Sequence, residues 1–81
     1  MAERPEIVAM TRLNLDDVHV VVRTGSCERT FKVHADRRPP LTVLVAEEDL
    51  QTAVREWPDL YRELIGRCRE LLRPSGEAVA A

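Results

Sequence analysis

A β-hairpin between residues 18 and 35 constrains the fold of this chain more than any other segment. The run from Val18 to Arg23 is rich in β-branched residues, and the segment from Glu28 to Ala35 alternates apolar and polar side chains. Both patterns are typical of strands. Gly25 and Ser26 suit a two-residue type II′ turn, because glycine adopts the positive φ of its first central position. The sequence therefore predicts two antiparallel strands joined by a tight turn.

Charge and hydrophobicity predict the register of this hairpin. A two-residue loop brings together residues that are either oppositely charged or both apolar: Arg23 with Glu28, Val20 with Phe31, Val18 with Val33 and Asp17 with His34. Each such cross-strand pair contributes about 0.2–1 kcal/mol. A register shifted by two residues would place His19 opposite His34 and lose the pairing of opposite charges, so we expect the first register.

Two further strands are expected on either side of the hairpin. Apolar residues between Glu6 and Leu15 indicate an N-terminal strand, although the pattern leaves open whether it forms. The run from Leu41 to Ala46 is almost wholly apolar, which favours a strand buried on most of its surface. Residues 37–40 are expected to form a loop, because two prolines cannot both enter a hydrogen-bonded ladder.

Two helices are expected to follow the strands. Acidic residues 47–49 favour a helix start, after which four apolar residues share one helical face: Leu50, Ala53, Val54 and Trp57. Pro58 suits the first turn of a second helix, which we expect to run to about Arg73 and to end at residues 74–76. Its apolar side chains fill an arc of about 140°: Leu60, Tyr61, Leu64, Ile65, Cys68, Leu71 and Leu72. The predicted fold is α+β, with a three- or four-stranded antiparallel β-meander followed by two C-terminal helices packed on one sheet face.

Length and charge exclude several classes of protein. A chain of 81 residues allows one small domain, which we expect to span residues 1–76, with residues 77–81 as a flexible C-terminal tail. The formal charge of −2 argues against non-specific binding of nucleic acids. No apolar run is long enough for a membrane span, and no signal peptide is evident. We expect a cytoplasmic protein with reduced cysteines, and its preference for arginine over lysine suggests a GC-rich bacterial genome.

No group of residues predicts catalysis or a bound cofactor. Cys27 is the one plausible exposed thiol, whereas Cys68 falls on an apolar helical face. His34 lies about 23 Å from Cys27 along the strand and His19 about 17 Å away, so neither can act as its base. Scattered glycines form no phosphate-binding loop, and both helix starts are acidic. We therefore expect no enzymatic activity and no cofactor.

Asp17, His19 and His34 are candidate metal ligands, because they fall on one sheet face. Two imidazoles and a carboxylate suit a divalent ion. The alternative is that His34 forms a hydrogen bond with Asp17 while His19 is an ordinary surface residue. The chain lacks the short cysteine or histidine spacings of metal sites, which favours this alternative.

Arginine side chains predict two basic surfaces for partner binding. Arg62, Arg69 and Arg73 form a ridge along the second helix, and Arg37 and Arg38 add a basic loop. The ridge suits an acidic partner or a phosphate backbone. The simpler interpretation is a solvated helix with short ion pairs: Glu63 with Arg67 and Glu70 with Arg73.

The sheet face away from the helices supplies a third candidate surface. It is expected to carry Val21, Leu44 and part of the N-terminal strand, and a monomer rarely exposes such an apolar patch. The N-terminal strand also offers an open sheet edge. We therefore expect a two-fold homodimer, or else the docking of a different protein on the same patch.

Taken together, these features favour a small stand-alone protein-binding module of the inhibitor, antitoxin, immunity or adaptor type, without catalytic activity. One alternative is a nucleic-acid-associated regulator that uses the arginine ridge. Another, less favoured, is a small metal-binding protein.

Overall fold

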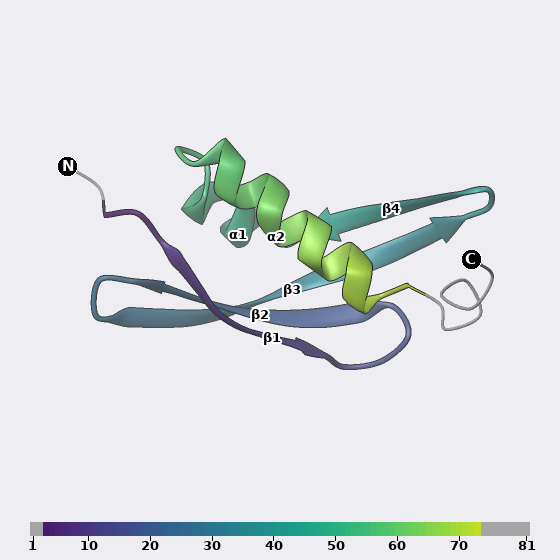
Figure 1. Cartoon of the computed structure of the whole chain (residues 1–81), viewed down its shortest axis with the longest axis horizontal. Coiled ribbons are helices and arrows are strands. Elements are labelled where there is room, and N and C mark those ends of the chain that lie inside the picture. The colour runs from purple at the N-terminus through teal and green to yellow at the C-terminus, as the bar shows by residue number, and fades with distance from the viewer. Residues whose placement is uncertain (1–2, 74–81) are drawn as a thin grey trace.

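A four-stranded antiparallel sheet followed by two helices makes up the computed structural model, which describes residues 3–73 (Figure 1). The strands lie in sequence order across the sheet: β1 (Glu6–Arg12), β2 (Asp17–Thr24), β3 (Cys27–Arg38) and β4 (Leu41–Ala46). The helices are α1 (Glu48–Ala53) and α2 (Pro58–Leu71). The predicted α+β layout is confirmed, with four strands in the meander. Helix α2 ends at Leu71, slightly before the predicted end at about Arg73. Residues 74–76, predicted to terminate it, and the predicted tail at 77–81 lie outside the described residues.

The central hairpin has the predicted register. All four predicted pairs are present across β2 and β3: Arg23 with Glu28, Val20 with Phe31, Val18 with Val33 and Asp17 with His34. Gly25 has a φ of 63°, and Ser26 has no positive φ. This combination is that of a type II′ turn rather than type I′.

Strand β3 is long enough to pair with different strands along its two halves. Its twelve residues pair with β2 as far as His34 and with β4 from Val33 onward. The end of β3 and the start of β4 therefore form a projecting two-stranded arm, residues 35–44, that extends past α2 in Figure 1. The arm contributes to the elongated shape of the molecule, 45 × 20 × 19 Å.

The predicted loop at residues 37–40 is shorter than expected. Arg37 and Arg38 belong to β3 and pair with Thr42 and Leu41, so only the two prolines turn the chain. The residue before a proline is restricted to extended conformations, which a strand end satisfies. The predicted loop was wrong for Arg37 and Arg38, because a residue that is kept out of the helical conformation and is not itself a proline can still pair in a strand.

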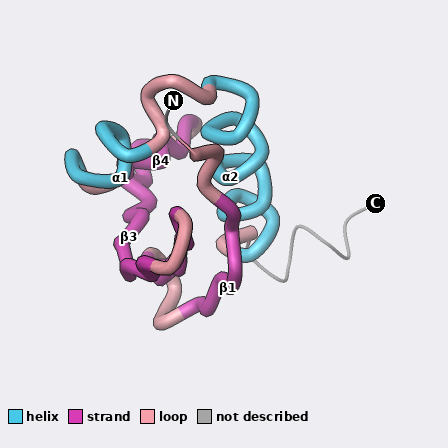
Figure 2. The backbone as a smooth tube through the Cα atoms, turned by 90° about the vertical axis from the view of Figure 1, so that its left-hand side faces the viewer, coloured by secondary structure: helices cyan, strands magenta, loops and turns pink. Residues whose placement is uncertain are grey.

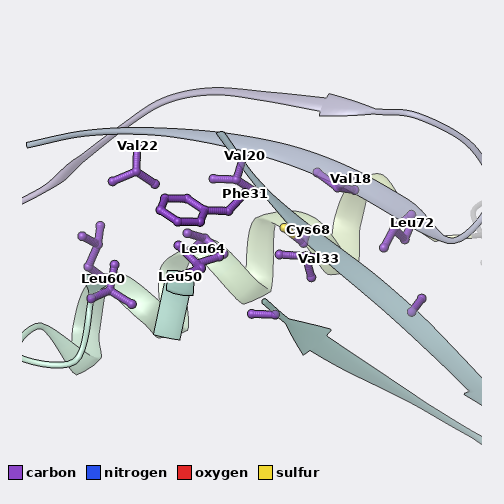
Figure 3. Close-up of a cluster of buried hydrophobic side chains, with 13 residues drawn as sticks. Val18, Val20, Val22, Phe31, Val33, Leu50, Leu60, Leu64, Cys68 and Leu72 are labelled. Atoms are coloured by element: carbon purple, nitrogen blue, oxygen red, sulfur yellow. The ribbon is translucent and has the colours of Figure 1, made fainter. Parts of the chain in front are cut away.

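The hydrophobic core lies between one face of the sheet and both helices. Figure 2 shows α2 on the β1 side of the sheet and α1 on the β3 side. Alternate residues of the central strands point into the core and meet the apolar faces of the helices (Figure 3): Val18, Val20, Val22, Phe31, Val33, Ala35, Ala46, Leu50, Val54, Leu60, Leu64, Cys68 and Leu72. Leu71 was predicted to belong to this set but is 37% exposed, whereas Leu72, the next residue, is buried.

Strand β4 differs most from its prediction, because it is exposed rather than buried. Leu41 is 67% exposed, and Val43 and Val45 are each 50% exposed. Leu44 points the other way and packs against the core, so its predicted place on the outer face was wrong. Since β4 pairs only with β3, its second edge and its outer face have no cover in the described part of the chain.

Candidate functional site

Asp17 and His34 form a hydrogen-bonded pair across β2 and β3. Nδ1 of His34 lies 2.7 Å from Oδ1 of Asp17, and Nδ2 of Asn14 donates a hydrogen bond to Oδ2 of the same carboxylate at 2.9 Å. The contact with His34, followed by that with Asn14, lowers the pKa of the Asp17 carboxyl. Both carboxylate oxygens therefore already have partners within the fold.

The third predicted metal ligand, His19, lies opposite Lys32 in the hairpin. Within residues 3–73, no group of three or more His, Cys, Asp or Glu side chains is placed to hold a metal ion. The structure brings Asp17 and His34 together but adds no third ligand to them. The pair therefore matches the hydrogen-bonded alternative that the sequence had left open.

The two cysteines differ in exposure, as predicted. Cys27 is exposed beside the hairpin turn, Cys68 is buried, and both are free thiols. Burial raises the pKa of the Cys68 thiol to about 11, which disfavours the nucleophilic thiolate. Cys27 is seven residues from His34 on the same strand, about 23 Å by strand geometry, so these two side chains form no catalytic pair.

The predicted arginine ridge is exposed along α2. Arg62, Arg69 and Arg73 are all exposed side chains. The two short ion pairs expected of a solvated helix are present: Arg73 with Glu70 at 3.0 Å and Arg67 with Glu63 at 3.9 Å. Among residues 3–73, Arg62 and Arg69 have no ion-pair partner.

Arg37 and Arg38 have different surroundings, although they are neighbours in β3. The guanidinium of Arg37 donates hydrogen bonds to three oxygen atoms: Oδ1 of Asp16 at 2.6 Å and the carbonyl oxygens of Leu15 at 2.8 Å and Leu72 at 2.9 Å. Arg38 forms an ion pair with Asp36 at 2.9 Å, and its side chain is 79% exposed. Arg37 is thus a tertiary contact of the fold, whereas Arg38 remains accessible near the tip of the arm.

Three of the predicted partner-binding arginines surround one open hollow between α2 and the arm. The hollow has a volume of about 300 Å³ and is lined by a mixture of cationic and apolar residues: Arg37, Pro40, Thr42, Leu44, Arg69, Leu72 and Arg73. Arg62 and Arg38 do not line it. Because Thr42 and Leu44 belong to β4, the hollow borders the exposed edge of the sheet.

The outer face of β4 carries a row of three apolar side chains. Leu41, Val43 and Val45 alternate with residues of the inner face, as strand geometry requires. Val21, the predicted centre of an apolar outer face, lies between Ala9 and Thr30 on the neighbouring strands. The exposed row on β4 is therefore separate from Val21.

The backbone of β4 has hydrogen-bonding groups that point out of the sheet. The Glu47 N–H donates to the Lys32 carbonyl oxygen at 3.1 Å, which makes these two residues a hydrogen-bonded pair of the antiparallel ladder. Such pairs alternate along a ladder with non-bonded pairs. Odd-numbered residues of β4 therefore direct their N–H and C=O toward β3, and even-numbered residues direct theirs outward: Thr42, Leu44 and Ala46.

One end of this open edge is closed by a side chain. Nε2 of Gln51 donates a hydrogen bond to the carbonyl oxygen of Ala46 at 2.9 Å. The outward groups of Thr42 and Leu44 have no hydrogen-bond partner among residues 3–73. The open segment therefore runs from Leu41 to Val45.

The opposite edge of the sheet, formed by β1, is protected. The ladder between β1 and β2 is irregular between Ile7 and Ala9, as at a β-bulge, and α2 contacts β1. The strand also carries charges at Glu6 and Arg12. Bulges, charges and a covering helix are the usual protection of an edge strand, whereas β4 is uncharged over its six residues.

The exposed row on β4 was missed by the sequence prediction, although one signal for it existed. The last strand of an open meander is an edge by topology, whatever its composition.

The chain matches no protein-family model, and it matches neither a curated protein nor a solved structure. Within residues 3–73, neither helix is long and apolar enough to cross a membrane.

Proposed function

We propose that this protein is a small protein-binding module without catalytic activity, which binds an extended segment of another protein along the β4 edge. The observation that carries this proposal is the open edge itself, with outward backbone groups at Thr42 and Leu44 beside the exposed row of Leu41, Val43 and Val45. An edge of this kind is a template for strand addition. The added strand gains affinity from main-chain hydrogen bonds and specificity from alternate side chains.

The two faces of the edge favour different side chains in the bound segment. On the outer face, the apolar row favours β-branched or aromatic residues. On the inner face, the hollow beside Thr42 and Leu44 is lined by Arg69, which has no ion-pair partner among residues 3–73 and favours an acidic residue. The preferred segment is therefore extended, apolar at alternate positions and acidic at a position between them.

A nucleic-acid-binding function has less support from the same surface. Arg37 is engaged with Asp16 and Arg73 with Glu70, so two of the three arginines around the hollow already have carboxylate partners. The net charge of the chain is −2, and electrostatic attraction dominates affinity for phosphate backbones.

Peptide binding tests the proposal. The probes are fluorescently labelled, lysine-flanked decapeptides that alternate valine with threonine, in versions with and without a central glutamate. We expect binding that slows hydrogen exchange at the amides of Thr42 and Leu44, with the glutamate version binding more tightly. A 20-nucleotide single strand, added in low salt, is expected to leave these amides unchanged.

Thr42→Pro is the matched variant for this experiment. Proline removes the N–H of residue 42, which points outward and has no partner among residues 3–73. Edge strands tolerate proline at such a position. We expect the variant to keep its circular dichroism spectrum and to bind the peptides at least about tenfold more weakly, equivalent to about 1.4 kcal/mol. Peptides that fail to bind, or that bind Thr42→Pro as well as the parent, would contradict strand addition at this edge.

A further inference from the structure

We infer that the β4 edge is covered by a second copy of this chain when no other partner is bound. Two copies would pair antiparallel through their β4 strands and join their four-stranded sheets into one sheet of eight strands. The inference rests on the proposed function, since it uses the same strand-binding edge. It commits to one occupant because β4 is complementary to itself in a single register.

Backbone geometry limits the registers in which two β4 strands can pair. Only even-numbered residues of β4 direct their N–H and C=O outward, so in a pair of β4 strands these residues must face each other. Thr42 opposite Leu44 of the second copy meets this requirement in both directions. The register therefore gives four backbone hydrogen bonds and places the two Val43 residues opposite each other on the two-fold axis.

The ends of the paired segment are also satisfied in this register. Ala46 falls opposite Pro40 of the second copy, and proline has no N–H to donate to the Ala46 carbonyl. That carbonyl already accepts a hydrogen bond from Gln51 within its own chain. In the register centred on Leu44, Ala46 would face Thr42 of the second copy, whose N–H would have to compete with Gln51 for the same carbonyl.

Side chains on the outer face match in the same register. Leu41 lies opposite Val45 of the second copy, and the two Val43 side chains meet at the centre. These are the three most exposed apolar side chains of β4, at 67%, 50% and 50%. Cross-strand pairs of branched apolar residues are favourable, and in this register each of the three has an apolar partner in β4 of the second copy.

Charges at the ends of the strand are complementary. The arm tip of one copy carries Arg38, which is 79% exposed although it also forms an ion pair with Asp36 of its own chain at 2.9 Å. In the antiparallel pair this tip reaches the end of β4 of the second copy, where the acidic residues Glu47 and Glu48 open α1. Because the contact is two-fold, opposite charges approach each other at both ends.

Sedimentation velocity between about 1 and 200 µM tests the inference, because a strand pair is a small interface and is expected to associate weakly. The chain mass is 9.2 kDa. We expect a shift from this mass toward twice its value as concentration rises. Over the same range, exchange at the amides of Thr42 and Leu44 should slow in step with the fraction of the chain in the dimer.

Two variants locate the interface and one serves as a control. Thr42→Pro removes an outward N–H, and Val43→Lys places a charge on the two-fold axis; both are expected to stay folded and monomeric at 200 µM. Val8→Lys is the matched control, because Val8 is a 42% exposed valine on the opposite edge strand. It is expected to dimerise like the parent.

Three outcomes would overturn the inference. The first is a dimer that persists in Thr42→Pro, and the second is a dimer that Val8→Lys dissociates. The third is a parent chain that stays monomeric at 200 µM. If that monomer still binds the decapeptides through Thr42, strand addition stands and only self-pairing fails; if it binds none of them, both proposals fail.

Discussion

The guanidinium of Arg37 and the backbone carbonyl of Leu72 are joined by a hydrogen bond of 2.9 Å, which ties the projecting arm to the end of α2. The carbonyl belongs to the C-terminal end of a helix, where the last C=O groups have no partner within the helix. A cation at this end also interacts favourably with the helix dipole. Since the same guanidinium contacts Asp16 and the carbonyl of Leu15, one side chain links three segments.

Replacement of this side chain is therefore expected to destabilise the fold. Arg37→Ala removes three hydrogen bonds from a charged donor that is 33% exposed, and we expect a loss of about 1–2 kcal/mol in the free energy of unfolding. The matched control is Arg38→Ala, which removes a neighbouring arginine that is 79% exposed and should change stability by less than about 0.5 kcal/mol. Urea denaturation measures both; equal effects would contradict the structural role of Arg37.

The contrast between these two arginines shows where sequence reasoning fails. The sequence predicted a basic loop because Arg37 and Arg38 precede two prolines, and no local pattern distinguishes them. Their roles diverge because strand alternation sends one side chain to each face of the arm. Asp16 lies 21 residues from Arg37 along the chain, and Leu72 lies 35 residues from it. These contacts therefore emerge only from the tertiary structure.

The hairpin could be predicted because the residues that determine it are close together in the sequence. Gly25 fixes the turn, and the charge pairs on either side of it fix the register. The exposed row on β4 could not be predicted in the same way, because an apolar run has the same composition in a buried strand and in an edge strand. What separates them is the place of the strand in the order of elements and whether another layer covers its outer face, and the composition of the run gives neither.

Leu64 tests the helical part of the core. It is completely buried on α2, so Leu64→Ala is expected to cost about 2–5 kcal/mol, which is enough to unfold many domains of this size. Leu71→Ala makes the same chemical change on the same helix at a residue that is 37% exposed, and should cost much less. Thermal denaturation followed by circular dichroism compares them; similar melting temperatures would show that α2 does not pack through Leu64.

The Asp17–His34 pair predicts a pH dependence of stability. Because the hydrogen bonds from His34 and Asn14 lower the pKa of Asp17 below its ordinary value of 3.8, the folded state favours the charged carboxylate. This stabilisation is fully present above the ordinary pKa and is lost as the pH falls through the lowered one. We expect the melting temperature of the parent to fall as the pH is lowered below about 4, and to fall less steeply in Asp17→Asn.

The comparison between variants is necessary because Asp59 contributes in the same sense. Its hydrogen bond with Arg4 also lowers its pKa. Asp17→Asn should therefore remove only part of the dependence of the melting temperature on acid pH. Glu48→Gln is the control, because Glu48 is exposed and has no ion pair among residues 3–73. Its melting temperature should change with pH in parallel with that of the parent. An unchanged profile in Asp17→Asn would contradict the predicted coupling.

Thiol labelling is an independent test of the packing of α2 against the sheet. Cys27 is exposed and Cys68 is buried, and the pKa of the Cys68 thiol is raised to about 11. An aromatic disulfide reagent at pH 8 should therefore modify one thiol rapidly in the native protein and both in urea, since the thiolate is the reactive form. In Cys27→Ser the rapid phase should disappear, and the remaining thiol should react only as fast as the protein opens. Rapid modification of both thiols in the native parent would show that the last turns of α2 do not cover Cys68.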